Sequence, residues 1–197
     1  MIAILDYGAG NLRSVENTLA EIGAEYTLAR DAGGLRDAAK IILPGVGHFG
    51  QMMRALDDMQ VRDVLVERMR AGVPFLGICL GLQALFERSE EAAEARGLGL
   101  YAGTVRRFPA GARVPHMGWN QLAACSESRL LAGLKPHAFF YFAHSYYAPA
   151  IRETAATCTY ALAYTAVLES GNTFAVQFHP EKSGPAGLQV VRNFVEL

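Results

Sequence analysis

The sequence predicts an α/β protein with a mixed, mostly parallel sheet, helices on both faces and an antiparallel extension. In the first half, short apolar runs alternate with helical patterns, which is typical of a parallel sheet. In the second half, β-branched and aromatic runs are separated by Gly, Pro and Asn, which is typical of hairpins. The 197 residues are 51% hydrophobic and 19% charged, so we expect one domain, 1–197, with a substantial core.

The first half is predicted to begin with a strand, Ile2–Leu5, followed by the turn-like DYGAGN and a helix. That helix carries apolar residues on one face and ends before Gly23. Further strands are expected at 26–28, 41–43 and 75–78, with a helix between the last two. The apolar residues of the two helices are Leu12, Val15, Leu19 and Ile22, and then Val61, Val64, Leu65 and Met69.

From about residue 98, four segments are predicted to form antiparallel strands that extend the sheet: GTVRRF, AFFYFAHSYY, TCTYALAYTAVL and NTFAVQF. A last helix begins at Gly184-Pro185, where proline suits the first turn. The charged, Ala-rich segment 87–96 is interpreted as a solvated helix end or loop.

Composition and spacing exclude several functions. With 18 basic and 19 acidic residues and no basic stripe, we expect no nucleic-acid and no membrane partner. The apolar runs are short and no basic region precedes MIAIL, which favours a cytoplasmic protein. Three cysteines without C-x-x-C spacing favour neither a disulfide framework nor zinc, and no His or acid cluster suggests another metal. DYGAGNLR has Arg13 where a dinucleotide fingerprint needs glycine, so no cofactor is expected.

Cys79 lies between two glycines in GICLG, where a predicted strand turns into a helix. Gly77 and Gly81 permit a tight turn without a Cβ clash, as in the G-x-S-x-G elbow. Ligands of open α/β sheets collect at this end of the strands, and helix N–H groups there favour a thiolate. The alternative is a small buried core residue, which is common for free cysteines and holds for Cys125 and Cys158.

A nucleophilic thiol needs a histidine and a group that orients it. Of five histidines, only His179, in AVQFHPEKS, ends a clear strand with a carboxylate two residues later, Glu181. His144 is interpreted as a hydrogen-bonded pocket or core residue. His48 and His116 lie in Gly-containing loops and are compatible with the surface.

An oxyanion needs backbone N–H donors, which glycine-rich loops present. LPGVGHFG follows the third strand and supplies Gly45, Val46 and Gly47, here named the oxyanion loop. The N–H of Leu80, after the nucleophile, is the second expected donor. The alternative for residues 45–47 is a plain strand-to-helix turn. Three strand ends thus supply a nucleophile, a base with its orienting group, and oxyanion donors. This combination favours acyl transfer.

PGVG, GICLG with Gln83, and HPEKS occur in an order that resembles the class I glutamine amidotransferases, over nearly the whole chain. The resemblance implies a flavodoxin-like fold with Cys79 as nucleophile on glutamine, His179 as base and Glu181 as orienter, releasing glutamate and ammonia. DYGAGNLRSV, VPHMGWNQL and YFAHSYY are similar to the glutaminase subunits of imidazole glycerol phosphate synthases.

That narrower resemblance implies a heterodimer with a (β/α)8-barrel cyclase subunit, which receives the ammonia and makes imidazole glycerol phosphate and AICAR in histidine biosynthesis. It implies that Gln83 and the Ser145-Tyr146 backbone hold L-glutamine. It also implies that Trp119 and Asn120 face the partner, with Tyr141 and Lys182 near the interface. From the residues alone, Trp119 is compatible with either an interface anchor or the core.

Three rival interpretations are a glutaminase subunit of another synthase, a binding module whose catalytic site has decayed, and a thiol peptidase or deglycase on a related scaffold. HMGWN and DYGAGN count against the first. Intact Cys79, His179 and Glu181 count against the second. The third gives no role to Gln83.

Overall fold

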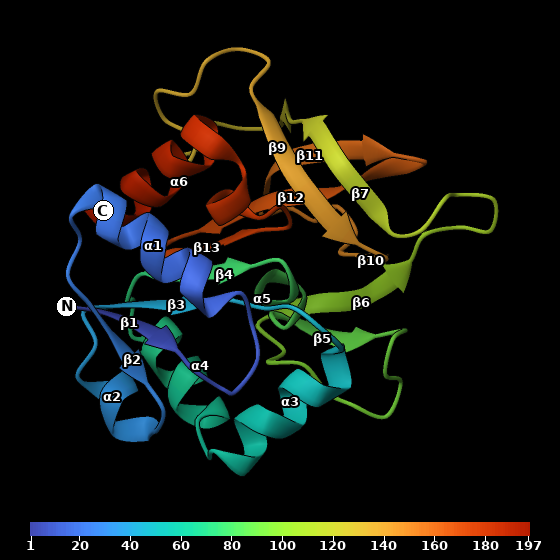
Figure 1. Cartoon of the computed structure of the whole chain (residues 1–197). Helices are drawn as coiled ribbons and strands as arrows, with labels where there is room; N and C mark the ends of the chain where they lie inside the picture. The colour runs from blue at the N-terminus through green and yellow to red at the C-terminus, as the bar shows by residue number, and fades with distance from the viewer.

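The computed structural model describes residues 1–197 and contains an eight-stranded sheet in the order β2-β1-β3-β4-β13-β12-β11-β8 (Figure 1). The five strands from β2 to β13 pair in parallel, and the remaining pairs are antiparallel. The predicted mostly parallel sheet with an antiparallel extension is confirmed. The strands are β1 Ile2–Leu5, β2 Tyr26–Ala29, β3 Lys40–Leu43, β4 Phe75–Ile78, β8 Ala123–Ala124, β11 Thr154–Tyr160, β12 Leu162–Ser170 and β13 Thr173–Val176.

Helices cover both faces of this sheet, as predicted (Figure 1). One face carries α1 (Leu12–Ile22) and α6 (Gly184–Glu196), and the other carries α2 (Ala32–Arg36), α3 (Phe49–Asp58) and α4 (Arg62–Arg70). Side chains alternate across the strands. Each strand therefore contributes side chains to a hydrophobic core on either face of the sheet. This explains why the central strands are apolar at nearly every position.

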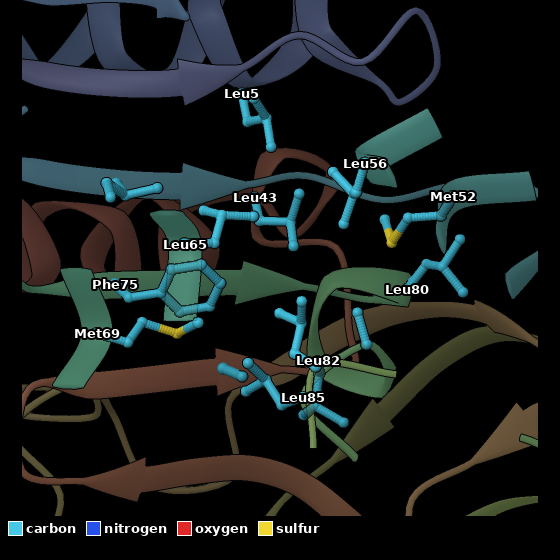
Figure 2. Close-up of a cluster of buried hydrophobic side chains, with 14 of the residues drawn as sticks. Leu5, Leu43, Met52, Leu56, Leu65, Met69, Phe75, Leu80, Leu82 and Leu85 are labelled. Atoms are coloured by element: carbon cyan, nitrogen blue, oxygen red, sulfur yellow. The ribbon is translucent and has the colours of Figure 1, made fainter. Parts of the chain in front are cut away.

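The core on the α3 and α4 side leads directly to the predicted elbow (Figure 2). Leu43 and Phe75 from the sheet pack with Leu65 and Met69 of α4, and Met52 of α3 lies close to Leu80. Every one of these side chains is at most 6% exposed. This core therefore packs against β4 and restrains the strand end from which the elbow begins.

Two smaller sheets stand beside the main one, and here the sequence prediction is wrong. GTVRRF lies in β6 (Tyr101–Arg107), which pairs with β5 (Phe86–Ser89) and β10 (Tyr146–Tyr147). AFFYFAHSYY spans β9 (Phe139–His144) and β10, and β9 pairs with β7 (His116–Gln121). Alternation identifies strands but carries no information about which distant strand pairs with them.

Two further segments differ from expectation. The helix between the third and fourth strands is two helices, broken at Gln60, whose φ of 55° ends the regular α3 backbone. Segment 87–96 is mostly exposed, as expected, but it begins in strand β5 and not in a helix end or loop. Two of its carboxylates have protein partners, because Glu91 accepts the Phe49 N–H at the start of α3 and Glu90 accepts the Arg107 N–H. No helix combines the length and the apolar character that crossing a membrane requires.

Candidate active site

Cys79 stands on a sharp turn between β4 and the one-turn helix α5 (Leu80–Gln83), with φ 53° and ψ −103°. Positive φ is costly for a residue with a Cβ, so the surroundings must hold it. The Cys79 N–H donates to the Val176 carbonyl at 2.7 Å, and the Cys79 carbonyl accepts from Leu82 at 3.0 Å. These bonds tie the turn to the neighbouring strand and hold the thiol at the carboxyl edge of the sheet.

The flanking glycines act through close approach, as predicted. A Cβ on Gly77 would lie 2.7 Å from the Gly81 carbonyl oxygen, and one on Gly81 would collide with the Leu43 carbonyl oxygen. Any side chain at either position would push α5 away from the strands. The positive φ is taken by Cys79 itself and not by a glycine.

His179 follows β13, the strand beside β4, and faces the same edge of the sheet. Its Nδ1 lies 2.9 Å from Glu181 Oε1, and both side chains are at most 3% exposed. The His179 N–H donates to the Tyr141 carbonyl at 2.9 Å, and the Ser183 hydroxyl donates to the His179 carbonyl at 2.7 Å. Because Glu181 accepts a hydrogen bond from the Nδ1–H, Nε2 is left to face the thiol.

Charge at the site favours an ion pair. Burial alone disfavours the imidazolium, but the Cys79 sulfur next to the ring and then Glu181 outweigh it and raise the pKa of His179 to about 10. The α5 helix has only four residues, so His179 is a stronger partner for a thiolate than the helix dipole. The arrangement suits nucleophilic attack on a carbonyl carbon.

The oxyanion loop lies against the elbow, but a carbonyl fills the place of the predicted donors. The Leu80 N–H donates to the Gly45 carbonyl at 3.4 Å. Gly45 is packed so tightly that a Cβ there would lie 2.6 Å from the Leu80 Cβ. Gly47 has φ +97° and open space around it. In this conformation the Leu80 N–H is therefore already hydrogen-bonded and does not face an incoming oxyanion.

A cleft of about 210 Å³ opens over the thiol and is bounded by the oxyanion loop, the elbow, β7 and the turn after β9. Eight of its lining residues are ones that the sequence analysis singles out for chemistry or substrate, including Gly47. Its lining comprises Val46, Gly47, Cys79, Leu80, Gln83, Glu91, Pro115, Met117, Ala143, His144, Ser145, Tyr146 and His179.

Gln83 is part of a hydrogen-bond chain at the floor of this cleft. Its Nε2 donates to the Tyr146 carbonyl at 2.9 Å and to Gln177 Oε1 at 3.1 Å. Gln177 in turn donates from Nε2 to Cys79 Sγ at 3.5 Å. Both Gln83 amide protons are thus used inside the protein, which leaves its carbonyl oxygen for a ligand.

Comparison with known proteins fits this geometry. Residues 3–197 match the family described as "Glutamine amidotransferase class-I". The chain belongs to this family. A relative from Methanothermobacter thermautotrophicus, "Imidazole glycerol phosphate synthase subunit HisH", is 50% identical over 100% of this chain and 98% of its own length. One of the same description from Chlorobium luteolum is 44% identical over the full length of both chains.

Solved structures share the amidotransferase fold. One described as "Crystal structure of glutamine amidotransferase" aligns with a TM-score of 0.79 at 21% identity, covering 99% of this chain and 97% of the other. "Structure of PurLQS from Thermotoga maritima" aligns with a TM-score of 0.78 at 19% identity and the same coverage. At this identity the likeness shows the fold alone.

Two histidines of this amidotransferase surround a buried tyrosine. His144 Nε2 lies 3.2 Å and His116 Nδ1 3.1 Å from the Tyr164 hydroxyl. Burial lowers the pKa of His144 to about 3 and that of His116 to about 4, so both are neutral. His144 is thus a hydrogen-bonded pocket residue, as interpreted, and His116 is buried rather than on the surface. His48 caps α3, where its Nδ1 accepts the Gly50 N–H.

Three polar residues at the site are missing from the sequence prediction. Asn11 donates from Nδ2 to Glu181 Oε1 at 3.1 Å, Gln177 contacts the thiol, and Glu91 lines the cleft. Asn11 belongs to the DYGAGN turn and Gln177 lies two residues before His179, so both are near recognised motifs. Glu91 has no such signal.

An exposed apolar patch, here named the β7–β9 patch, lies on β7 and β9 beside the cleft. Met117, Trp119 and Phe139 are 65%, 55% and 52% exposed. Trp119 pairs with Tyr141 across the two strands, with ring centroids 5.9 Å apart, so it is not a core residue. Nearby, Asn120 donates to the Thr159 carbonyl, and Lys182 is exposed in the turn Pro180–Lys182.

Proposed function

We propose that residues 1–197 form one glutaminase domain that hydrolyses L-glutamine and delivers ammonia to a cyclase subunit of imidazole glycerol phosphate synthase. The observation that carries the proposal is the thiol on the elbow beside an imidazole held by a buried carboxylate, 2.9 Å from Nδ1. The full-length relatives named as subunits of that synthase support the assignment to histidine biosynthesis. Three unpaired cysteines are compatible with a cytoplasmic location.

The chemistry follows from the ion pair. The Cys79 thiolate attacks the side-chain amide carbon of glutamine, and the carbonyl π electrons move to oxygen. As the C–N bond breaks, the His179 imidazolium donates its Nε2 proton to the departing nitrogen, which leaves as ammonia. Neutral His179 then removes a proton from water, whose oxygen attacks the thioester. The C–S bond breaks and restores thiolate and imidazolium. Glu181 keeps the ring in one tautomer throughout.

The cleft offers complementary groups for an amino acid. The Gln83 carbonyl oxygen and the backbone of Ser145 and Tyr146 are hydrogen-bonding groups on its floor and wall. Glu91 supplies an acidic group in the same cleft, which we assign to the α-ammonium group of the substrate. His144 contributes indirectly, because its Nδ1 lies 2.8 Å from the Tyr146 carbonyl and fixes that turn.

The oxyanion loop is the proposed switch. With the Gly45 carbonyl directed at the Leu80 N–H, an oxyanion would meet negative charge instead of a donor. Turning the peptide between Gly45 and Val46 would present the Val46 N–H and free the Leu80 N–H. Glycine on both sides of Val46 permits this change. Ammonia would then be made only when partner and acceptor substrate have turned the loop.

The β7–β9 patch supplies the docking surface in this proposal. Trp119, Asn120, Tyr141 and Lys182 lie on it or at its edge, next to the cleft from which ammonia must leave. A half-exposed tryptophan flanked by other apolar side chains is typical of an interface anchor. The barrel form of the cyclase comes from the resemblance of the sequence.

The decisive experiment measures glutamate release by the purified chain, alone and with a cognate cyclase subunit plus its ribonucleotide substrate. We expect strong stimulation that Cys79→Ala abolishes. Cys125→Ala is the matched control and should retain it, because this cysteine is exposed, not in the core as expected, and does not line the catalytic cleft. Full activity without a partner, or none under any condition, would refute the assignment.

The switch has its own test. Gly47→Val places a β-branched residue at φ +97°, which it cannot adopt without strain. Stimulated turnover should then fall more than glutamine binding. Equal losses in turnover and in binding would count against a switch in this loop.

A further inference from the structure

Tyr7 has a buried hydroxyl that the proposed mechanism leaves unused. The residue follows β1 at the same sheet edge as Cys79, and its side chain joins the core on the α3 side. Only 8% of Tyr7 is exposed, and no group in the structure accepts its O–H proton. A buried O–H donor without an acceptor costs on the order of 1–3 kcal/mol, so it calls for an explanation.

The hydroxyl faces the rear of the oxyanion loop. Burial raises the pKa of Tyr7, and the backbone N–H of Val46, which points at the hydroxyl, partly opposes this. A second cavity, of about 180 Å³, lies between Tyr7 and the loop. It is lined by Tyr7, Ala9, Val46, His48, Gln51, Met52 and Ala55. Val46 borders both this cavity and the catalytic cleft, so it lies between the two.

The orientation of this peptide determines what Tyr7 meets. The bond between Gly45 and Val46 is trans, since the only cis peptide is Val114-Pro115. Its C=O and N–H therefore point in opposite directions. With the Gly45 carbonyl toward Leu80, the N–H is directed toward Tyr7, which agrees with the influence of Val46 on that hydroxyl. We name this the carbonyl-in orientation.

Turning the peptide over would exchange these directions. The Val46 N–H would enter the cleft beside the Leu80 N–H, and the Gly45 carbonyl would swing into the rear cavity. There the Tyr7 O–H could donate to it, because a hydroxyl is a donor as well as an acceptor. The buried proton that lacks a partner in the carbonyl-in orientation would gain one in this carbonyl-out orientation.

We propose that Tyr7 is a positioning residue whose hydroxyl receives the Gly45 carbonyl and so stabilises the oxyanion loop in its donor-presenting form. The inference rests on the proposed function, because it concerns regulation of the same site. Tyr7 touches neither glutamine nor the reacting atoms. It acts by making the carbonyl-out orientation less costly, and phenylalanine at this position would fill the same space without doing so.

The test compares Tyr7→Phe with the unmodified chain in complex with the cyclase subunit and its ribonucleotide substrate. Loss of one buried hydrogen bond in the carbonyl-out form should lower stimulated kcat by about ten-fold. The KM for glutamine should stay within about two-fold, since ground-state binding is untouched. The thermal midpoint of the free chain should be unchanged or higher, because the unpaired hydroxyl has been removed. Tyr26→Phe, at a hydroxyl 3.4 Å from Glu16, is the control.

The outcomes separate the possible failures. Unchanged stimulated kcat in Tyr7→Phe would overturn the proposal. Losses of kcat that come with a lower thermal midpoint or a raised KM would also overturn it, in favour of a plain structural role. If the unmodified complex shows no stimulation while Cys79 is intact, the proposed function itself fails, and that result is visible before any Tyr7 variant is made.

Discussion

Glu181→Gln is the substitution whose effect the hydrogen bonds define most closely. Oε1 of Glu181 accepts from His179 Nδ1 at 2.9 Å and from Asn11 Nδ2 at 3.1 Å, whereas Oε2 is buried without a partner. The Asn11 amide is itself oriented, because the Ser14 hydroxyl donates to its Oδ1 at 2.9 Å. A glutamine should therefore keep its oxygen at the Oε1 position and place its NH₂ at the unpaired one.

The expected loss of kcat in Glu181→Gln follows from the single property that the substitution changes. The imidazole tautomer is preserved, and only the charge of the acceptor is lost. Charged hydrogen bonds are about twice as strong as neutral ones, so the loss is about 1–1.5 kcal/mol, or about ten-fold in kcat. Asn11→Ala alone keeps the carboxylate and should cost only a few-fold. In the double variant the amide is free to turn, and its NH₂ would force the wrong tautomer at a cost on the order of 10³-fold or more.

The assay is partner-stimulated glutamate release at saturating glutamine, measured for the unmodified chain, the two single variants and the double variant. The fold loss of kcat in the double variant should be far greater than the product of the two single fold losses. Asn17→Ala, at an exposed asparagine of the same helix, serves as control. If Glu181→Gln alone is as damaging as the double variant, or if the two losses simply multiply, Asn11 does not orient the acceptor and the reasoning is refuted.

Three other predictions follow from the same structure. The pKa of His179 is about 10 in the folded chain and about 6.5 when unfolded, so its stabilising contribution is full below about pH 6.5 and is lost as the pH rises to about 10. Urea midpoints should fall as the pH approaches 10, and less steeply in Cys79→Ala; equal slopes in the two chains would contradict the ion pair. Gly81→Ala adds a methyl group that collides with the Leu43 carbonyl, which should lower the free energy of unfolding by about 3 kcal/mol. The thermal midpoint measured by scanning calorimetry should then fall by roughly 6–12 °C; an unshifted midpoint would show that the turn can relax. Trp119→Ala should weaken cyclase binding about thirty-fold by titration calorimetry without changing the thermal midpoint, since the side chain is 55% exposed; unchanged affinity would move the interface elsewhere.

What the sequence predicts well are features that a few adjacent residues determine. Gly77 and Gly81 indicate the elbow because only glycine allows the backbone contacts found there. Glu181 lies two residues from His179, so their contact is local and independent of how the rest of the chain folds. The apolar strands of the parallel half are recognised because burial on both faces leaves no polar position.

What the sequence does not predict depends on distant pairing. Asn11 reaches Glu181 over 170 positions because α1 and the turn after β13 meet beside the sheet, and no local pattern encodes this. The same holds for β6 and β9, whose alternation is that of any half-buried strand but whose partners lie in separate small sheets. The direction of the Gly45 carbonyl depends on a backbone torsion, and the sequence PGVG is compatible with either direction.

The position of β13 between β4 and β12 also has a consequence during synthesis on the ribosome. Chains emerge from their N-terminus, so the segment with Cys79 is made long before residues 173–179. Until that last central strand inserts, the cysteine has neither the Val176 carbonyl that holds its turn nor the histidine that lies beside it in the folded chain. A nascent or C-terminally truncated chain therefore has no assembled catalytic site, and the site forms only when nearly the whole polypeptide is present.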